Sequence, residues 1–144
     1  MFNFDETGNL LCFIVHPGGP FWKNKNDGAW TIPKGECEEN EDKLQTAIRE
    51  FYEETGILAE DPFIELGFIK QKAGKLVYSW AFKGQFSGNL NCTSYCELEY
   101  PRKSGKIISI PEIDKGGFFN KIECKKLINP AQFEFIEKLE KIVF

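Results

Sequence analysis

The sequence predicts an α/β (α+β) fold in which a mixed β-sheet lies between helices. Two observations lead to this expectation. A helix with one apolar stripe falls early among strand-like segments, at residues 41–55, and a second helix follows Pro130 near the end of the chain. Helices placed among and after strands pack on the faces of the sheet that those strands form. We expect residues 1–144 to form a single domain of this kind.

The segments ahead of the first helix have the patterns of strands and turns. Residues 10–16 form a short apolar run, which is typical of a strand buried on both faces. Turn residues at positions 6–9 allow residues 2–5 to pair with this run as a hairpin. A Gly-Gly-Pro loop and a polar stretch follow, and residues 29–32 then form a strand that leads toward the helix.

The first helix is predicted from its two ends and its periodicity. Asn40 is a candidate N-cap, and Glu41 and Asp42 in the first turn suit the positive end of the helix dipole. Gly56 supplies the left-handed residue that commonly ends a helix. Apolar residues recur at helical spacing, so one stripe should face the core. This stripe consists of Leu44, Ala47, Ile48 and Phe51.

The second half of the chain contains further strand-like segments and a final helix. Residues 63–71 and 75–83 have strand character and are joined by an Ala-Gly turn. Residues 96–100 precede a second loop at 101–106, and residues 106–110 form a further strand. The final helix should bury the face that carries Phe133, Ile136, Leu139 and Ile142.

Composition and charge restrict the class of protein. A hydrophobic fraction of 42% with 28% charged residues is ordinary for a globular domain, and the net charge of −4 disfavours a general nucleic-acid binder. The five cysteines are odd in number and show neither a disulfide framework nor a zinc spacing, so we expect reduced thiols. No apolar run has transmembrane length and no signal peptide is visible, so we expect a cytoplasmic protein without a membrane partner.

Three glutamates of the first helix indicate a metal site. Glu50, Glu53 and Glu54 lie three and four residues apart, so they converge on one face, offset from the apolar stripe. Like charges at this spacing repel one another, and a hard divalent cation that takes oxygen ligands removes the repulsion. A solvated acidic face is the alternative interpretation. The pattern favours Mg²⁺ or Mn²⁺ bound to the three carboxylates.

The segment GECEENEDKLQTAIREFYEETGI, residues 35–57, resembles the Nudix box with every specified position filled. Further likeness, in HPGGPFW, AWTIPKGE, YPRKSGK and PEID, extends over about residues 10 to 140 and is similar to a bacterial subgroup of predicted nucleoside-triphosphate pyrophosphohydrolases. The resemblance implies the Nudix fold, an α/β/α sandwich with a mixed sheet. It also implies metal-dependent hydrolysis of a pyrophosphate bond in a nucleoside diphosphate linked to another moiety.

The resemblance assigns roles within the box. Glu53, Glu54, Glu50 and Arg49 are the expected catalytic residues, and Arg49 either braces a box glutamate or forms a surface pair with Glu53. The same resemblance implies that Glu41 is a bracing residue or an outer metal ligand. The expected metal ligands are Glu50, Glu53, Glu54, Glu41 and the main-chain carbonyl of Lys34, in the loop that Gly35 begins.

Residues outside the box are candidates for substrate contact. Trp22, in a polar loop, can stack on a nucleobase, whereas Trp30 is expected in the core. His16 is either structural or placed at a phosphate, and the cluster Arg102, Lys103 and Lys106 is either a solvated loop or a phosphate site. Lys34 can also hold phosphate. Candidates for an additional catalytic base are Glu112, Glu97, Glu99 and Asp114.

The expected partner is a small nucleotide, either a nucleoside triphosphate or a dinucleoside polyphosphate such as diadenosine tetraphosphate, with a nucleotide sugar less favoured. Nucleic acid is not expected, because removal of an RNA cap needs a basic track. The alternative class is a non-catalytic Nudix-fold domain that binds a nucleotide as a sensor. Such a domain is expected to lose box carboxylates, and this chain keeps them. Oligomeric state stays open.

Overall fold

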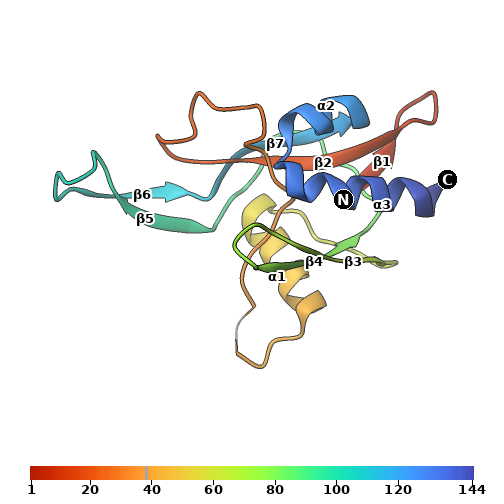
Figure 1. The fold of residues 1–144 in the computed structure, drawn as a ribbon, viewed down its shortest axis with the longest axis horizontal. Helices are drawn as coiled ribbons and strands as arrows, with labels where there is room; N and C mark the ends of the chain where they lie inside the picture. The colour runs from red at the N-terminus through yellow and green to blue at the C-terminus, as the bar shows by residue number, and fades with distance from the viewer. Residues whose placement is uncertain (38) are drawn as a thin grey trace.

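The computed structural model describes residues 1–37 and 39–144, in which one helix interrupts the series of strands and the other helices follow the last strand (Figure 1). The α/β (α+β) class is confirmed. The elements are β1 (Phe2–Phe4), β2 (Leu10–Pro17), α1 (Lys43–Thr55), β3 (Ile64–Lys70), β4 (Leu76–Ala81), β5 (Tyr95–Glu99), β6 (Ile107–Pro111), β7 (Ile113–Asn120), α2 (Lys121–Leu127), the 3-10 helix η1 (Pro130–Gln132) and α3 (Phe133–Val143). None of these helices has both the length and the apolar character needed to span a bilayer.

The strands divide into three antiparallel sheets, with the orders β1-β2-β7, β3-β4 and β5-β6. Parallel pairing among the described residues is restricted to two isolated bridges, Phe2 with Lys83 and Trp30 with Ile128. Instead of one continuous mixed sheet, the described residues thus form three separate antiparallel sheets, with parallel pairing confined to these two bridges. The predicted N-terminal hairpin is confirmed, since β1 pairs with β2 from Phe2 opposite Cys12 to Phe4 opposite Leu10.

The central strand β2 separates two hydrophobic cores. One core lies under α2 and α3 and contains Trp30, Ile128 and Phe135, all buried. The other lies against α1 and contains Phe13 and Phe51, whose ring centroids are 6.2 Å apart. Because side chains alternate along a strand, β2 contributes to both cores and fixes α1 relative to the rest of the chain.

The ends and orientation of α1 differ in part from the prediction. Asp42, not Asn40, is the N-cap, because its carboxylate accepts a hydrogen bond from the Gln45 N–H. Asn40 instead has a φ of 62° in the preceding turn, a conformation that asparagine tolerates. Gly56 ends the helix in the left-handed region, as predicted, with a φ of 76°. Of the expected apolar stripe, Phe51 is buried and the other three members are half-buried.

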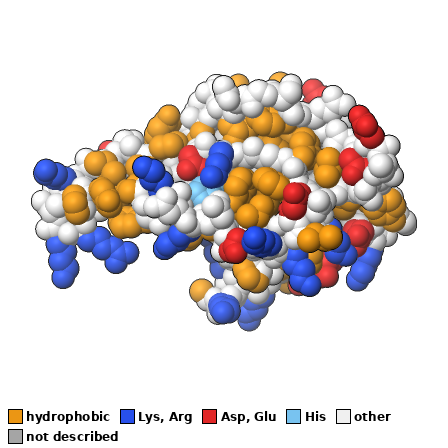
Figure 2. All heavy atoms as spheres, turned by 90° about the horizontal axis from the view of Figure 1, so that it is seen from above, with side chains coloured by type: hydrophobic (Ala, Val, Ile, Leu, Met, Phe, Trp, Pro, Cys, Tyr) orange, Lys and Arg blue, Asp and Glu red, His pale blue; other side chains and the backbone are white. Residues whose placement is uncertain are grey.

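The β5-β6 hairpin projects from the body of the protein (Figure 1). Its strands begin at Tyr95 and Ile107, and the loop between them forms the tip farthest from α1 in this view. In Figure 2, the charged side chains visible at this projecting end are almost all Lys or Arg. The hairpin therefore carries positive charge away from the box helix.

We predict that Trp30→Ala lowers the free energy of unfolding by about 3–5 kcal/mol, the range for a large aromatic residue deleted from a core. Trp30 is 6% exposed, and its ring packs against Phe119 with centroids 5.1 Å apart. Urea unfolding measures the change. Ile122→Ala is the control, because Ile122 is 84% exposed and its loss should change stability by less than about 0.5 kcal/mol. Equal effects of the two substitutions would contradict the assignment of Trp30 to the core.

Candidate active site

Glu54 is a carboxylate buried inside the fold. It lies in the last turn of α1, is 3% exposed, and its Oε2 accepts a hydrogen bond of 3.1 Å from the main-chain N–H of Lys34. Burial raises the pKa of Glu54 to about 8, although the Lys34 N–H and ammonium act in the opposite direction. The sequence predicted Glu54 on one face of the helix with Glu50 and Glu53, offset from the apolar stripe. The structure instead buries it, because the loop entering the box passes over this part of the helix.

Arg49 holds the other box carboxylates together. Its Nε and Nη2 donate to the two carboxylate oxygens of Glu41 at 2.8 and 2.9 Å, a bidentate pair. Its Nη1 donates to Glu50 at 3.0 Å and to Glu53 at 3.1 Å. These contacts, with Glu41 foremost, raise the pKa of Arg49 further above its ordinary value. Both interpretations of Arg49 therefore describe part of its role, since it pairs with Glu53 and also braces Glu41 and Glu50.

Glu41 is fixed from two sides. Besides the pair with Arg49, its Oε1 accepts a hydrogen bond of 2.8 Å from the Thr46 hydroxyl. Thr46 is buried in the first half of α1, so it ties Glu41 to the helix. These contacts fit the predicted bracing role of Glu41. Sequence reasoning did not identify Thr46, whose position within the box carries no signal of its own.

Gly35 leaves room for the carboxyl group of Glu50. A Cβ atom at position 35 would overlap the carboxyl carbon of Glu50, so only glycine allows the main chain to pass this close. Burial raises the pKa of Glu50, and the neighbouring Arg49 opposes that shift. The main chain at Lys34 and Gly35 thus lies beside Glu50 and Glu54, where a backbone carbonyl can join carboxylates around a cation.

The donor set suits a hard divalent cation. Carboxylate and carbonyl oxygens are the ligands that Mg²⁺ and Mn²⁺ take, and Glu50, Glu53 and Glu54 supply them within two turns of one helix. Among residues 1–37 and 39–144, no three carboxylate, thiol or imidazole groups already stand as a closed ligand set. Arg49 draws Glu50 and Glu53 toward itself, and Lys34 engages Glu54. A cation at this place would compete with Arg49 and with the Lys34 N–H for the carboxylate oxygens.

A cleft of about 1210 Å³ adjoins the box helix. Polar groups on its wall include Lys34, Glu50, Glu54 and Glu112, and apolar groups include Phe21, Trp22, Leu98 and Ile110. Glu112 is close enough to raise the pKa of both Glu50 and Glu54 by its charge. The cleft thus combines a carboxylate-rich side with an aromatic and aliphatic side.

The structure distinguishes between the four candidate bases. Glu112 lines the cleft, whereas Glu97 and Glu99 are exposed on β5 and do not line it. Asp114 is engaged with His16, at 2.8 Å between Oδ1 and the ring Nδ1. Of the four, Glu112 alone faces the box glutamates.

The candidate substrate-binding residues also divide into those that line the cleft and those that do not. Lys34 and Trp22 line the cleft, and Trp22 is 41% exposed in the loop after β2. The loop of Arg102, Lys103 and Lys106 forms the tip of the projecting hairpin and does not line the cleft (Figure 1). His16 is 1% exposed with both ring nitrogens hydrogen-bonded within the protein, so the structure does not support direct contact with substrate.

Sequence reasoning did not identify Phe21, Leu98 or Ile110 as cleft residues. They come from the loop after β2 and from both strands of the β5-β6 hairpin, segments far apart in the chain. Each has the pattern of an ordinary apolar residue. They can be recognised as cleft residues only from the fold, which brings them together.

A sequence model of the NUDIX domain matches residues 1–97, a stretch that contains the whole box and α1. This match covers most of the chain and agrees with the fold and with the carboxylates gathered on α1. The chain belongs to the Nudix family.

Two kinds of characterised protein are similar to the chain. The mRNA-decapping protein g5R of African swine fever virus (isolate Pig/Kenya/KEN-50/1950) is 35% identical over 146 aligned positions, covering 92% of this chain and 56% of g5R. The asymmetrical bis(5'-nucleosyl)-tetraphosphatase of Rattus norvegicus is 40% identical over 57 positions, covering 35% of this chain and 39% of that enzyme. The chain thus spans little more than half the length of g5R.

The raised pKa of Glu54 predicts how the stability of the metal-free protein depends on pH. Between the ordinary pKa of 4.5 and about 8, the folded state binds more protons than the unfolded state, so stability falls as pH rises through this range. Glu54→Gln should remove this dependence and stabilise the protein at pH 8, by on the order of a few kcal/mol. Urea unfolding in chelator between pH 5 and 8.5 measures both effects.

The exposed Glu60→Gln substitution is the matched control for this experiment, and it should leave the pH dependence of wild type in place. Parallel pH curves for wild type and Glu54→Gln would show that Glu54 ionises normally in the folded state.

Proposed function

We propose that the protein is a Mg²⁺- or Mn²⁺-dependent pyrophosphohydrolase that cleaves a nucleoside diphosphate linked to another moiety. The observation that carries the proposal is the position of Glu50 and Glu54 on the wall of the cleft, beside the main chain of Lys34 and Gly35. Family membership supports the same reaction class. A buried carboxylate of raised pKa on a cleft wall favours a catalytic site over one that only binds nucleotides.

The bound cation would neutralise charge on the pyrophosphate oxygens and lower the pKa of a water molecule. The residues of the chain then have separate tasks. Glu50 and Glu54 would hold the cation at the cleft wall, Arg49 braces Glu50 and Glu53, and Lys34 adds positive charge at the cleft. In the hydrolysis itself, the water oxygen bonds to phosphorus as the bridging P–O bond breaks.

A carboxylate must accept the proton that this water releases. Glu53 is the first candidate, because Arg49 holds it beside Glu50, a residue of the cleft wall, although Glu53 does not itself line the cleft. Glu112 is the second, because it lines the cleft opposite the box. The remaining candidates, Glu97, Glu99 and Asp114, lie on the exposed hairpin or in the contact with His16.

The nucleoside end of the substrate is assigned to the aromatic side of the cleft. Trp22 and Phe21 are partly exposed there, and a nucleobase can stack on either ring. A nucleoside triphosphate or a dinucleoside polyphosphate with its base on Trp22 would have its phosphates in the cleft that Glu50 and Glu54 also line. The name of the rat relative, a bis(5'-nucleosyl)-tetraphosphatase, supports the dinucleoside polyphosphate.

A capped RNA is the second candidate substrate. The g5R relative is named as an mRNA-decapping protein, and its similarity covers 92% of this chain. The Lys and Arg side chains at the projecting end offer a surface for phosphodiesters (Figure 2). The overall charge of −4 disfavours this candidate.

A substrate panel tests the proposed activity. We expect hydrolysis of a nucleoside triphosphate or a dinucleoside polyphosphate with Mg²⁺ or Mn²⁺, none in excess chelator, and little with Ca²⁺, whose looser coordination positions the reactants poorly. Capped RNA belongs in the same panel. Glu53→Gln and Glu54→Gln should each lower kcat by at least about 100-fold while the protein stays folded. Near wild-type turnover of both variants, or full turnover in chelator, would exclude the mechanism.

Trp22→Ala should weaken nucleotide binding by about 1–3 kcal/mol if Trp22 stacks on the base. The unfolding free energy should change little, because Trp22 is 41% exposed. Measurement of KM for the best substrate, beside urea unfolding, separates the two effects. An unchanged KM would place the base elsewhere in the cleft.

A further inference from the structure

His16, near the end of β2, is the only histidine in the chain and is 1% exposed. Its Nδ1 lies 2.8 Å from Oδ1 of Asp114 on β7, and its Nε2 lies 2.6 Å from the main-chain oxygen of Lys25. The imidazole ring therefore connects strand β7 with the middle of the loop that follows β2.

Both partners of the ring are hydrogen-bond acceptors. A carboxylate and a peptide carbonyl cannot donate, and a neutral imidazole has one N–H, which serves only one of them. The imidazolium has two N–H groups and serves both. In the neutral ring, one nitrogen lone pair would face an oxygen lone pair in a buried place, and such an unsatisfied contact is unfavourable.

The charged and aromatic neighbours of the ring are Asp114, Lys115 and Trp30. Lys115 pairs in register with His16, but its ammonium lies over the Trp30 ring, 5.6 Å from the centroid. Trp30 also packs edge-on against the imidazole, with centroids 5.3 Å apart, while the Asp114 side chain on the other side of the ring is 36% exposed.

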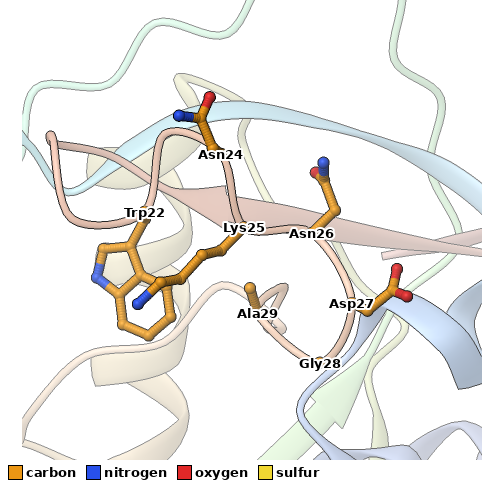
Figure 3. Close-up of a pocket in the computed structure, with 7 residues that line it drawn as sticks. All are labelled: Trp22, Asn24, Lys25, Asn26, Asp27, Gly28 and Ala29. Atoms are coloured by element: carbon orange, nitrogen blue, oxygen red, sulfur yellow. The ribbon is translucent and has the colours of Figure 1, made fainter.

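The contact with Lys25 fixes the loop that carries Trp22. Figure 3 shows this loop from Trp22 to Ala29 curving around a pocket of about 470 Å³. Main-chain hydrogen bonds tie its two ends, from Gly18 to Glu112 and from Gly28 to Lys126. The contact of His16 with Lys25 anchors the loop between these two ends, at a position three residues after Trp22. The Lys25 ammonium in turn lies 5.4 Å from the centroid of the Trp22 ring.

We propose that His16 is a positioning residue which, as a doubly protonated imidazolium, holds the Trp22 loop against β7 and so sets the geometry of nucleobase binding. The part that concerns the nucleobase rests on the proposed function. The tie between loop and strand does not, since it follows from the hydrogen bonds alone. Asp114 contributes to this positioning, because its negatively charged carboxylate pairs with the positively charged imidazolium.

The protonation state can be observed directly, because a chain with one histidine gives one set of imidazole signals. In the ¹⁵N-labelled protein at neutral pH, we expect both ring nitrogens of His16 to show the shifts of protonated nitrogens, with two slowly exchanging N–H protons. A single protonated nitrogen, or a ring in fast exchange with water, would overturn the proposal.

Two variants test the positioning role. His16→Gln retains a donor for one acceptor only, and Asp114→Asn keeps an acceptor but removes the negative charge. Amide hydrogen exchange across residues 18–28 should become faster in both variants. For the best substrate of the panel, KM should rise by about 10-fold with kcat within about twofold, the size expected for one lost charge-assisted hydrogen bond. Glu65→Gln, an exposed change of charge on β3, is the control and should alter neither.

The outcomes separate this proposal from the proposed function. If the protein hydrolyses nucleotides and both variants keep the wild-type KM and loop exchange, the positioning role is overturned while the enzyme remains. If no nucleotide in the panel is hydrolysed, the proposed function fails, and the nitrogen shifts and loop exchange still decide the role of His16. If His16→Gln does not fold, Asp114→Asn and the wild-type spectrum decide it.

Discussion

The side chain of Arg49 allows the box helix to keep so many carboxylates on one side. Its guanidinium group donates to Glu41, Glu50 and Glu53 within 2.8 to 3.1 Å, so three negative charges share one delocalised positive charge. Glu54 lies outside this set, and its burial raises its pKa to about 8. The repulsion among these carboxylates is thus reduced in two different ways, by the ion pairs with Arg49 and by the weaker ionisation of Glu54. Lysine at position 49 could not make the same hydrogen bonds, because its compact ammonium lacks the planar geometry for bidentate contact with a carboxylate.

Local patterns predicted the box helix well because its determinants lie within one segment. Gly56 as the end of α1, Trp30 in the core and the N-terminal hairpin all follow from neighbouring residues, and the structure confirms them. The N-cap was misplaced by two residues because asparagine and aspartate at positions 40 and 42 both suit that role. Helix ends are decided by which side chain reaches the first free N–H groups, and spacing alone does not decide this.

Features set by long-range contacts lay beyond the reach of the sequence. His16 and Asp114 are 98 residues apart, so no local pattern reveals that the lone histidine is buried against a carboxylate. Glu54 has the spacing of a surface residue, and only the loop passing over it makes it a buried one. The cluster at Arg102 resembles a phosphate site in sequence, but it does not line the cleft, and Arg102 instead lies over the outer aromatic ring of Phe21, 5.1 Å from its centroid. Charge and residue type indicate what a group can do, whereas the path of the main chain decides where it acts.

The position of β2 between its neighbours has a consequence for how the chain acquires its structure. β2 pairs with β7 from Leu11 opposite Asn120 to Pro17 opposite Ile113, so about a hundred residues separate partners in the same ladder. During synthesis, this strand must wait for β7 to emerge from the ribosome before either core can close. The β3-β4 and β5-β6 hairpins, by contrast, join segments close in sequence and can form early. Until β7 arrives, the apolar strand at residues 10–16 remains unprotected, and this interval is when the nascent chain is most exposed to aggregation.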